Sequence, residues 1–238
     1  MQFSVVTLAC TLLLASFGHA LPSGGPLESR AELGHDKIKP MGEAVGGGDG
    51  AVLYKKFQPT LKVQGGCVPF PAVDKDGNVS KGLKATGLHN GKCSKSTGQI
   101  YCRGHNIDGK FAILYAWYMP KDAFSHRHDF EYIVVWLSSN KKDAKLLGVA
   151  YSRHGDTVKI KAPNVGLKNN RLRVQYYLDG SSYSVKKHNY AEGGFQPLIN
   201  YAQMPDKARK TLAGHSFGSA NVPFIDKNFI NNIKEAKL

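Results

Sequence analysis

Two apolar runs decide the fold of this chain. The first, FAILYAWY, occupies residues 111–118 and ends shortly before Pro120, and the second, EYIVVWL, occupies residues 131–137. Both runs are rich in β-branched and aromatic residues, which favour strands. The first run is apolar at every position, so both of its faces would be covered by protein. We therefore predict two buried strands at the centre of the molecule.

Shorter strand candidates follow, and turn residues at 139–140, 155–156 and 179–180 divide them. The further predicted strands are residues 146–152, 158–161, 172–178 and 196–201. Short helices are expected over residues 51–57, over residues 206–212 and from Asp226 onward. Many short strands with close turns predict a mostly β protein: a single-domain antiparallel β-sandwich with short flanking helices.

The first residues resemble an export signal. Residues 1–20 contain no Asp, Glu, Lys or Arg, hold an apolar run over 5–16 and close with Gly18-His19-Ala20. This pattern is typical of a secretory signal peptide, and the run is shorter than the roughly 20 residues of a membrane span. We expect a secreted, extracellular protein in which residues 21–50 form a flexible leader and residues 51–238 form the domain.

The net charge of the chain is +14. Three explanations compete for it: nucleic acid, an anionic surface such as a membrane or cell wall, and plain solubility. The basic residues are scattered and form no RNA-binding signature. We therefore expect no nucleic-acid partner and a monomeric protein, while the acidic surface and the solvated charge both remain open.

Cysteine spacing predicts one disulfide. After removal of Cys10 with the signal peptide, Cys67, Cys93 and Cys102 remain, and two of three should pair in an oxidising compartment. A bridge between Cys67 and Cys93 would close a polar loop and stabilise the fold by about 3 kcal/mol, leaving Cys102 over. Asn78 begins an Asn-Val-Ser sequon in the same loop, which is expected to be exposed, and is a candidate for glycosylation.

The densest chemistry lies between the two central runs, in DAFSHRHDFE at residues 122–131. If the second strand extends backwards, Asp129 and Glu131 share one face and His126 and His128 share the other. Asp122 joins the two acids if the link before them folds back. Three carboxylates beside an imidazole would suit a hard divalent cation, Mg²⁺ or Ca²⁺, with water in the remaining positions.

Two other interpretations of this stretch stay open. The acids could simply pair with Arg127 and nearby lysines in an exposed loop. Alternatively His126, His128 and a carboxylate could bind zinc in a hydrolase, although the helical HExxH spacing is lacking. No Cys–His partnership is evident, so the sequence gives no support for nucleophilic catalysis.

Several motifs resemble one protein family. AILYAWYMPKD at 112–122, SHRHDFE at 125–131 and IVVW at 133–136 resemble the central strand, the heptapeptide GHRHDWE and the following strand of the necrosis- and ethylene-inducing-peptide-like (NPP1) proteins of plant-associated microbes. Outer matches include CVPFPAVD at 67–74, QPLI at 196–199 and FGSANVPF at 217–224, with the family's two bridge cysteines at Cys67 and Cys93. The resemblance covers most of residues 51–232.

The resemblance implies a β-sandwich with an acidic cavity for one divalent cation and no covalent chemistry, hence no enzyme. The expected metal-site residues are Asp122, His126, Asp129 and Glu131, and the expected cavity-shaping residues are Arg127, His128 and Phe130. The implied partners are a glycosylated sphingolipid of the plant plasma membrane and a plant pattern-recognition receptor that perceives the segment from Ala112 to Val134. The implied setting is the host apoplast, where the protein would act as a virulence effector.

Departures from the family pattern lie around the cavity. Ser125 replaces a Gly and Phe130 a Trp, only residues 123–125 link the two motifs, and Ser184 stands where the family tends to carry a His. We therefore predict an effector that is non-cytolytic or weakly cytolytic and is recognised by plants as an immune pattern. An active cytolysin that damages the membrane is the alternative, and a secreted metallohydrolase is the remote one.

Overall fold

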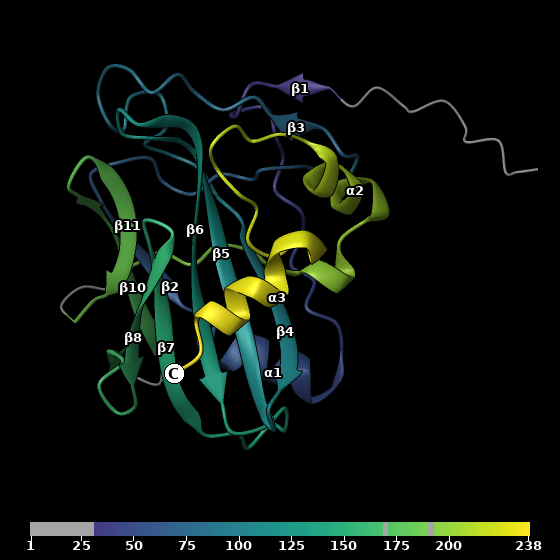
Figure 1. The fold of residues 1–238 in the computed structure, drawn as a ribbon. Helices are drawn as coiled ribbons and strands as arrows, with labels where there is room; N and C mark the ends of the chain where they lie inside the picture. Colours follow the sequence, from purple (N-terminus) through teal and green to yellow (C-terminus); the bar gives the residue numbers. More distant parts are fainter. Residues whose placement is uncertain (1–30, 169–170, 190–192) are drawn as a thin grey trace, which may run out of the picture.

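The computed structural model describes residues 31–168, 171–189 and 193–238 (Figure 1). The expected signal peptide and the first ten residues of the expected leader lie outside this part of the chain. The strands are β1 (Glu32–Leu33), β2 (Thr60–Gln64), β3 (Val79–Ser80), β4 (Ile100–Ile107), β5 (Lys110–Asp122), β6 (His126–Leu137), β7 (Leu146–Arg153), β8 (Asp156–Lys161), β9 (Leu167–Lys168), β10 (Arg171–Asp179), β11 (Ser182–Lys187) and β12 (Leu198–Asn200). The helices are α1 (Gly48–Lys56), α2 (Asp206–Gly214) and α3 (Asp226–Glu235), with a 3₁₀ turn at Tyr201–Gln203.

A six-stranded sheet forms the larger layer, in the order β12-β4-β5-β6-β7-β8. The two predicted central strands are its middle: β5 and β6 pair antiparallel, from Phe111 opposite Leu137 to Asp122 opposite His126. Trp117 and Trp136 are fully or almost fully buried on these strands. The apolar character of both runs therefore reflects a sheet that is covered on both faces.

A second sheet packs beside the first. β10 pairs antiparallel with β11 and parallel with β2, and β9 extends it at the start of β10. Figure 1 shows β2, β10 and β11 next to β6 and β7, and the Tyr176 hydroxyl of β10 reaches Asp129 of β6. The mostly β sandwich with flanking helices is thus confirmed, although β1–β3, β2–β10 and β4–β12 add parallel pairs that the sequence did not indicate.

Strand β5 passes through Pro120, where the sequence predicted its end. The Pro120 carbonyl accepts a hydrogen bond from Leu83 N (2.8 Å), so this residue directs its backbone groups away from β6. The neighbouring β4 begins at Ile100, opposite Trp117, and so does not reach Pro120. Proline therefore removes no ladder hydrogen bond here, and the strand can continue to Asp122.

Three short helices cover the sheets near the positions predicted for them. In α3, Phe229 and Ile233 are buried, and the indole Nε1 of Trp136 donates to the Ala236 carbonyl just beyond the helix (2.8 Å). Figure 1 shows α3 crossing in front of β5 and β4. No helix among the described residues is long and apolar enough to cross a bilayer.

The expected flexible leader is wrong for residues 31–50. β1 pairs with β3, His35 Nε2 lies 2.8 Å from the Lys92 carbonyl oxygen, and Met41 N donates to Gln99 Oε1 (2.7 Å). Ile38 and Met41 are buried in the core. These two apolar residues stand alone among glycines, prolines and charges, so no periodicity marked them as core.

Candidate functional site

The two acids of β6 lie between the sheets. Asp129 and Glu131 are two residues apart on one face of the strand, as predicted, and both are buried. Asp129 accepts a hydrogen bond from the Tyr176 hydroxyl of β10 (2.7 Å), and Glu131 accepts one from the Ser152 hydroxyl of β7. Each carboxylate is therefore held by a neutral donor rather than by a cation.

Asp122 joins this region from the end of β5, because residues 123–125 make a tight link with Ala123 at φ 34°. Its side chain is 1% exposed. It accepts hydrogen bonds from the Tyr183 amide (2.8 Å) and the Ser182 hydroxyl of β11, and His126 Nε2 lies 3.4 Å from it. The short link thus holds Asp122 against the second sheet.

The two histidines do not share a face, so that prediction is wrong. His126 lines the same cavity as Asp129 and Glu131. His128 instead lies 2.7 Å from the Tyr118 hydroxyl and packs edge-on against Phe217. His128 has φ 62°, a left-handed conformation that interrupts the two-residue alternation of a strand and turns the preceding residues to the other side.

Of the other expected cavity-shaping residues, one lines the cavity. Phe130 does so, and it also packs against Tyr118 and Phe217 with ring centroids 5.1 and 5.2 Å away. Arg127 is exposed, and its guanidinium donates to the Lys81 carbonyl (2.7 Å) instead of pairing with the acids. The exposed-loop interpretation of this stretch is therefore wrong as well.

Burial and mutual repulsion perturb the acids. Burial raises the pKa of the Asp129 carboxyl to about 7, the negative charge of Asp122 adds to the rise, and the Tyr176 hydroxyl opposes it. Burial, and then the charge of Asp129, raise the pKa of Glu131 well above its usual value. On the far side of the strand, burial lowers the pKa of His128 to about 4. A cation between the acids would relieve the repulsion that raises the first two pKa values.

The acids open into a cavity of about 480 Å³. Its lining includes the acids Asp129, Glu131, Asp156 and Glu235, the histidines His126 and His154, and hydroxyls such as Ser152 and Ser182, and no Lys or Arg of the described residues belongs to it. In a chain with a net charge of +14 this is a local acidic hollow. No sequence pattern marked Ser152, Ser182 or Tyr176, since these residues reach the acids from three other strands.

The oxygen donors are chemically suited to a hard cation, but the side chains alone do not surround one. Carboxylate and hydroxyl oxygens are the ligands that Mg²⁺ and Ca²⁺ prefer. Within residues 31–168, 171–189 and 193–238, however, no three His, Cys, Asp or Glu side chains converge closely enough to hold a metal by themselves. Asp129 and Glu131 would therefore hold the ion, with water completing its coordination. The oxygens of Asp122 already accept hydrogen bonds from Ser182 and Tyr183.

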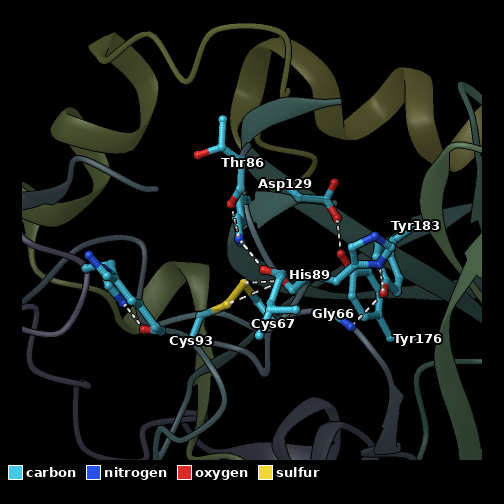
Figure 2. The surroundings of a disulfide bond; sticks show 12 residues. Gly66, Cys67, Thr86, His89, Cys93, Asp129, Tyr176 and Tyr183 are labelled. Atoms are coloured by element: carbon cyan, nitrogen blue, oxygen red, sulfur yellow. Dashed lines mark hydrogen bonds between the residues drawn. A yellow bond between two sulfur atoms is a disulfide. The ribbon is translucent and has the colours of Figure 1, made fainter. Parts of the chain in front are cut away.

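A disulfide braces the loop beside the acids (Figure 2). Cys67 and Cys93 are bonded, as predicted, and Cys102 is free and buried. His89, inside the bridged loop, lies 3.0 Å from the Tyr183 hydroxyl, and Tyr183 stacks on Tyr176 with ring centroids 4.6 Å apart. Because Tyr176 binds Asp129, the bridge supports one wall of the acidic site.

The sequon is not on an exposed loop. The Asn78 amide nitrogen donates to Asp74 (2.9 Å), and Val79 and Ser80 are buried as β3. Ser80 Oγ accepts hydrogen bonds from the Gly82 amide and the Tyr118 hydroxyl. In the folded protein the sequon is therefore occupied by internal contacts.

The comparisons with known proteins agree with this architecture. A model of the necrosis inducing protein (NPP1) family matches residues 52–236. NLP effector protein 10 of Phytophthora capsici is 38% identical, covering 87% of this chain and 92% of its own length. The necrosis-inducing protein NPP1 of Phytophthora nicotianae is 34% identical, covering 86% and 90%.

Solved structures match equally well. The non-toxic HaNLP3 protein has a TM-score of 0.81 and 32% identity, covering 85% of this chain and 98% of its own. NLPPya in complex with mannosamine has a TM-score of 0.81 and 33% identity, covering 87% and 100%. Fold, sequence and family model agree, and the chain belongs to the necrosis inducing protein (NPP1) family.

Proposed function

We propose that this protein is a secreted effector of a plant-associated microbe that acts in the host apoplast, is non-cytolytic or weakly cytolytic, and is recognised by plants as an immune pattern. Two kinds of observation support the setting: the export signal expected at residues 1–20 and the relatives named as NLP effectors in Phytophthora. The solved relatives include one described as non-toxic.

The weak-cytolysis part of the proposal rests on Asp122, whose carboxylate oxygens already accept hydrogen bonds within the protein. A link of three residues sets Asp122 directly opposite His126, where the Ser182 hydroxyl and the Tyr183 amide take its oxygens. One of the three carboxylates is therefore satisfied inside the protein. A cation in the cavity would have to rely on Asp129 and Glu131, which lowers its expected affinity.

The cation would supply positive charge and open coordination positions for sugar hydroxyls. The chain's own residues would prepare this site: Tyr176 and Ser152 orient the two carboxylates, and His126 borders them. Asn221 and Asn232 also line the cavity and offer amide groups that suit a sugar. The proposed ligand is the glycosylated headgroup of a plant sphingolipid, bound weakly.

An active cytolysin is the second candidate, and one observation favours it. The acidic cavity of about 480 Å³ persists despite the short link, and NLPPya, of the same fold, has been solved with mannosamine and with glucosamine. If amino sugars or sugar headgroups enter the acidic cavity of this protein, membrane damage could follow.

We infer that the protein is not an enzyme. Cys102 is fully buried, and burial raises the pKa of its thiol, which opposes formation of a reactive thiolate. The sequence GHSFG at residues 214–218 has the spacing of a nucleophile motif, but it follows helix α2 instead of a strand, and Ser216 Oγ accepts a hydrogen bond from Gly218 N.

Most of the proposed immune pattern is inaccessible in the folded state. The segment from Ala112 to Val134 comprises most of β5 and β6, which are the middle strands of the larger sheet and are largely buried. A receptor that binds an extended peptide could reach it only after unfolding or proteolysis. The pattern role therefore depends on breakdown of the protein, whereas headgroup binding depends on its integrity.

Infiltration of dicot leaves tests the proposal. The mature protein should induce defence-gene expression with little or no necrosis, and Asp129→Ala should give the same defence response. Strong necrosis from the unmutated protein that Asp129→Ala abolishes would instead establish the cytolysin. A defence response from neither protein nor peptide would reject the pattern role.

A further inference from the structure

The two most exposed large apolar side chains of the described residues lie close together beside the acidic cavity. Leu88 is 77% exposed and Phe124 is 64% exposed. The ring of Phe124 packs edge-on against His89, the residue after Leu88, with ring centroids 4.6 Å apart. We call Leu88 and Phe124 the apolar tip.

The apolar tip is held in place by buried contacts. Lys121, which is 2% exposed, directs its ammonium group to the carbonyl oxygens of Thr86 (3.0 Å) and Leu88 (2.7 Å). Gly91 N also donates to the Leu88 carbonyl (2.9 Å), and the Cys67–Cys93 disulfide closes the loop. A loose loop could fold its leucine onto the protein, whereas this one is fixed with the side chain in solvent.

The loop that carries Leu88 is basic, while the exposed acids Glu32 and Asp36 lie next to residues that hydrogen-bond to Lys81 and Lys92 of this loop. Between residues 77 and 107 the chain has no Asp or Glu, and the loop over residues 81–97, which we call the basic loop, carries four lysines. Lys81, Lys84, Lys92 and Lys95 are all exposed, as is Arg127 at the start of β6. An apolar pair framed by cations is complementary to a surface with negative headgroups over a hydrocarbon interior.

The tip also adjoins the rim of the acidic cavity. Ser125, next to Phe124, donates its hydroxyl to the Ser181 carbonyl (3.1 Å), and Ser182 and His126 line the cavity. A protein resting on the tip would therefore place the cavity mouth near the same surface. The Lys141–Lys145 turn lies at the other end of the β5–β6 hairpin, beyond Leu137.

We propose that the apolar tip and the basic loop dock this protein onto an anionic phospholipid surface, with Leu88 and Phe124 entering the headgroup region. This docking goes beyond the proposed headgroup binding because it needs neither sugar nor cation. It gives the weakly binding cavity a means of staying at a membrane.

Flotation of the full mature protein with phospholipid vesicles tests the docking. Binding is expected to vesicles of phosphatidylcholine with phosphatidylserine, not to phosphatidylcholine alone, and should weaken with added salt. Leu88→Ser with Phe124→Ser should lower the partition coefficient about tenfold or more, since two apolar side chains no longer leave water. The matched control, Val158→Ser with Phe195→Ser, removes two exposed apolar side chains elsewhere and should leave partitioning unchanged.

A charge-matched pair tests the basic loop. Replacing Lys84, Lys92 and Lys95 by Ser should reduce binding strongly, while replacing Lys141, Lys142 and Lys145 by Ser, an equal loss of charge, should reduce it much less. Asp129→Asn should bind as the unmutated protein does, so loss of headgroup binding and loss of docking are separable. Equal effects of the two lysine variants would overturn the docking surface in favour of net charge alone.

The Phe124→Trp variant provides a fluorescence signal that reports insertion directly and does not depend on loss of binding. Its fluorescence emission should shift to the blue on anionic vesicles, because the indole enters a less polar environment. Binding without that shift, or binding that survives the Leu88/Phe124 variant, would overturn the proposal. So would a concentration-dependent dimer that the same variant abolishes, because the tip would then contact a second copy of the chain.

Discussion

The Tyr176 hydroxyl donates to the Asp129 carboxylate across 2.7 Å, and this hydrogen bond joins the two sheets at the acidic cavity. Tyr176 is buried on β10, and Asp129 is buried on β6. The bond thus serves the fold and the site together: it satisfies one oxygen of a buried carboxylate and fixes the orientation of the carboxylate that would face a cation.

Removing this donor should destabilise the protein. Tyr176→Phe leaves a buried carboxylate oxygen without its partner, so we expect the free energy of unfolding to fall by about 1–3 kcal/mol. Chemical denaturation in the presence of a chelator measures it. Tyr177→Phe, the neighbouring half-buried tyrosine, is the control and should cost much less. Equal losses in the free energy of unfolding from both variants would show that the hydrogen bond between Tyr176 and Asp129 adds no particular stability.

The raised pKa of Asp129 predicts a pH-dependent stability. Between its ordinary value of 3.8 and about 7 the native carboxyl keeps a proton that the unfolded chain has released. The native state thus binds more protons there, and the free energy of unfolding should fall as the pH rises through this window. Denaturation in chelator at pH 5 and pH 8 measures the change.

Comparison with Asp129→Asn isolates this carboxyl together with its effect on Glu131, whose pKa the charge of Asp129 also raises. His128, whose pKa burial lowers to about 4, contributes the opposite slope below its ordinary value of 6.5, and subtraction of the two proteins cancels it. The unmutated protein should lose more stability than Asp129→Asn between pH 5 and pH 8. Identical pH dependence of the two would reject the raised pKa.

Opening Asp122 should strengthen cation binding. Ser182→Ala removes the hydroxyl that donates to Asp122, so a carboxylate oxygen becomes available to a cation while the apo protein loses a hydrogen bond. We expect a larger Mg²⁺- or Ca²⁺-induced rise in Tm for Ser182→Ala than for the unmutated protein, since a ligand that binds only the native state stabilises it. Ser181→Ala is the control. No gain in Ser182→Ala would argue against Asp122 as the missing ligand.

The disulfide should contribute mainly by closing its loop. Cys67 and Cys93 are 26 residues apart, so reduction should lower the free energy of unfolding by about 3–4 kcal/mol in the loop-entropy model. Denaturation with and without a reductant gives the value, with Cys67→Ser/Cys93→Ser as the second measurement. A change far below 1 kcal/mol would contradict the loop-entropy account of this bridge.

Recognition of the β5–β6 segment should require breakdown of the fold. A synthetic peptide from Ala112 to Val134 should trigger defence at once, whereas intact protein should act only when apoplastic proteases are active. Protease inhibitors in leaf fluid should therefore delay the response to the protein and not to the peptide. An undelayed response to intact protein would place recognition on its folded surface.

Strong local patterns made much of the fold predictable. The continuous apolar runs gave β5 and β6, and a proline or an aspartate before an amphipathic turn gave α2 and α3. Strand β4 was missed because Arg103, Gly104 and His105 interrupt its apolar character, and only pairing with the whole of β5 makes it a strand. Ordering of residues 31–47 likewise comes from long-range contacts that leave no periodic signature.

The site was predictable in its acids and not in its surroundings. Asp129 and Glu131 share a face because strand alternation holds over them. His126 lies beside them only because His128 has a left-handed backbone conformation, and no residue type in this stretch indicates that conformation. Ser152, Ser182 and Tyr176 approach from β7, β11 and β10, and such convergence depends on how the sheets pack.

Leakage of dye from vesicles of dicot plasma membrane tests the central claim. That claim is that the protein is weakly cytolytic or non-cytolytic because the Asp122 oxygens are taken by internal hydrogen bonds. The mature protein would be compared with Asp129→Ala in the presence of Mg²⁺ and Ca²⁺, with the Phytophthora nicotianae relative as the positive control. The account predicts leakage from the unmutated protein no greater, or only slightly greater, than from Asp129→Ala. Rapid leakage that the Asp129→Ala substitution abolishes would contradict it and establish an active cytolysin.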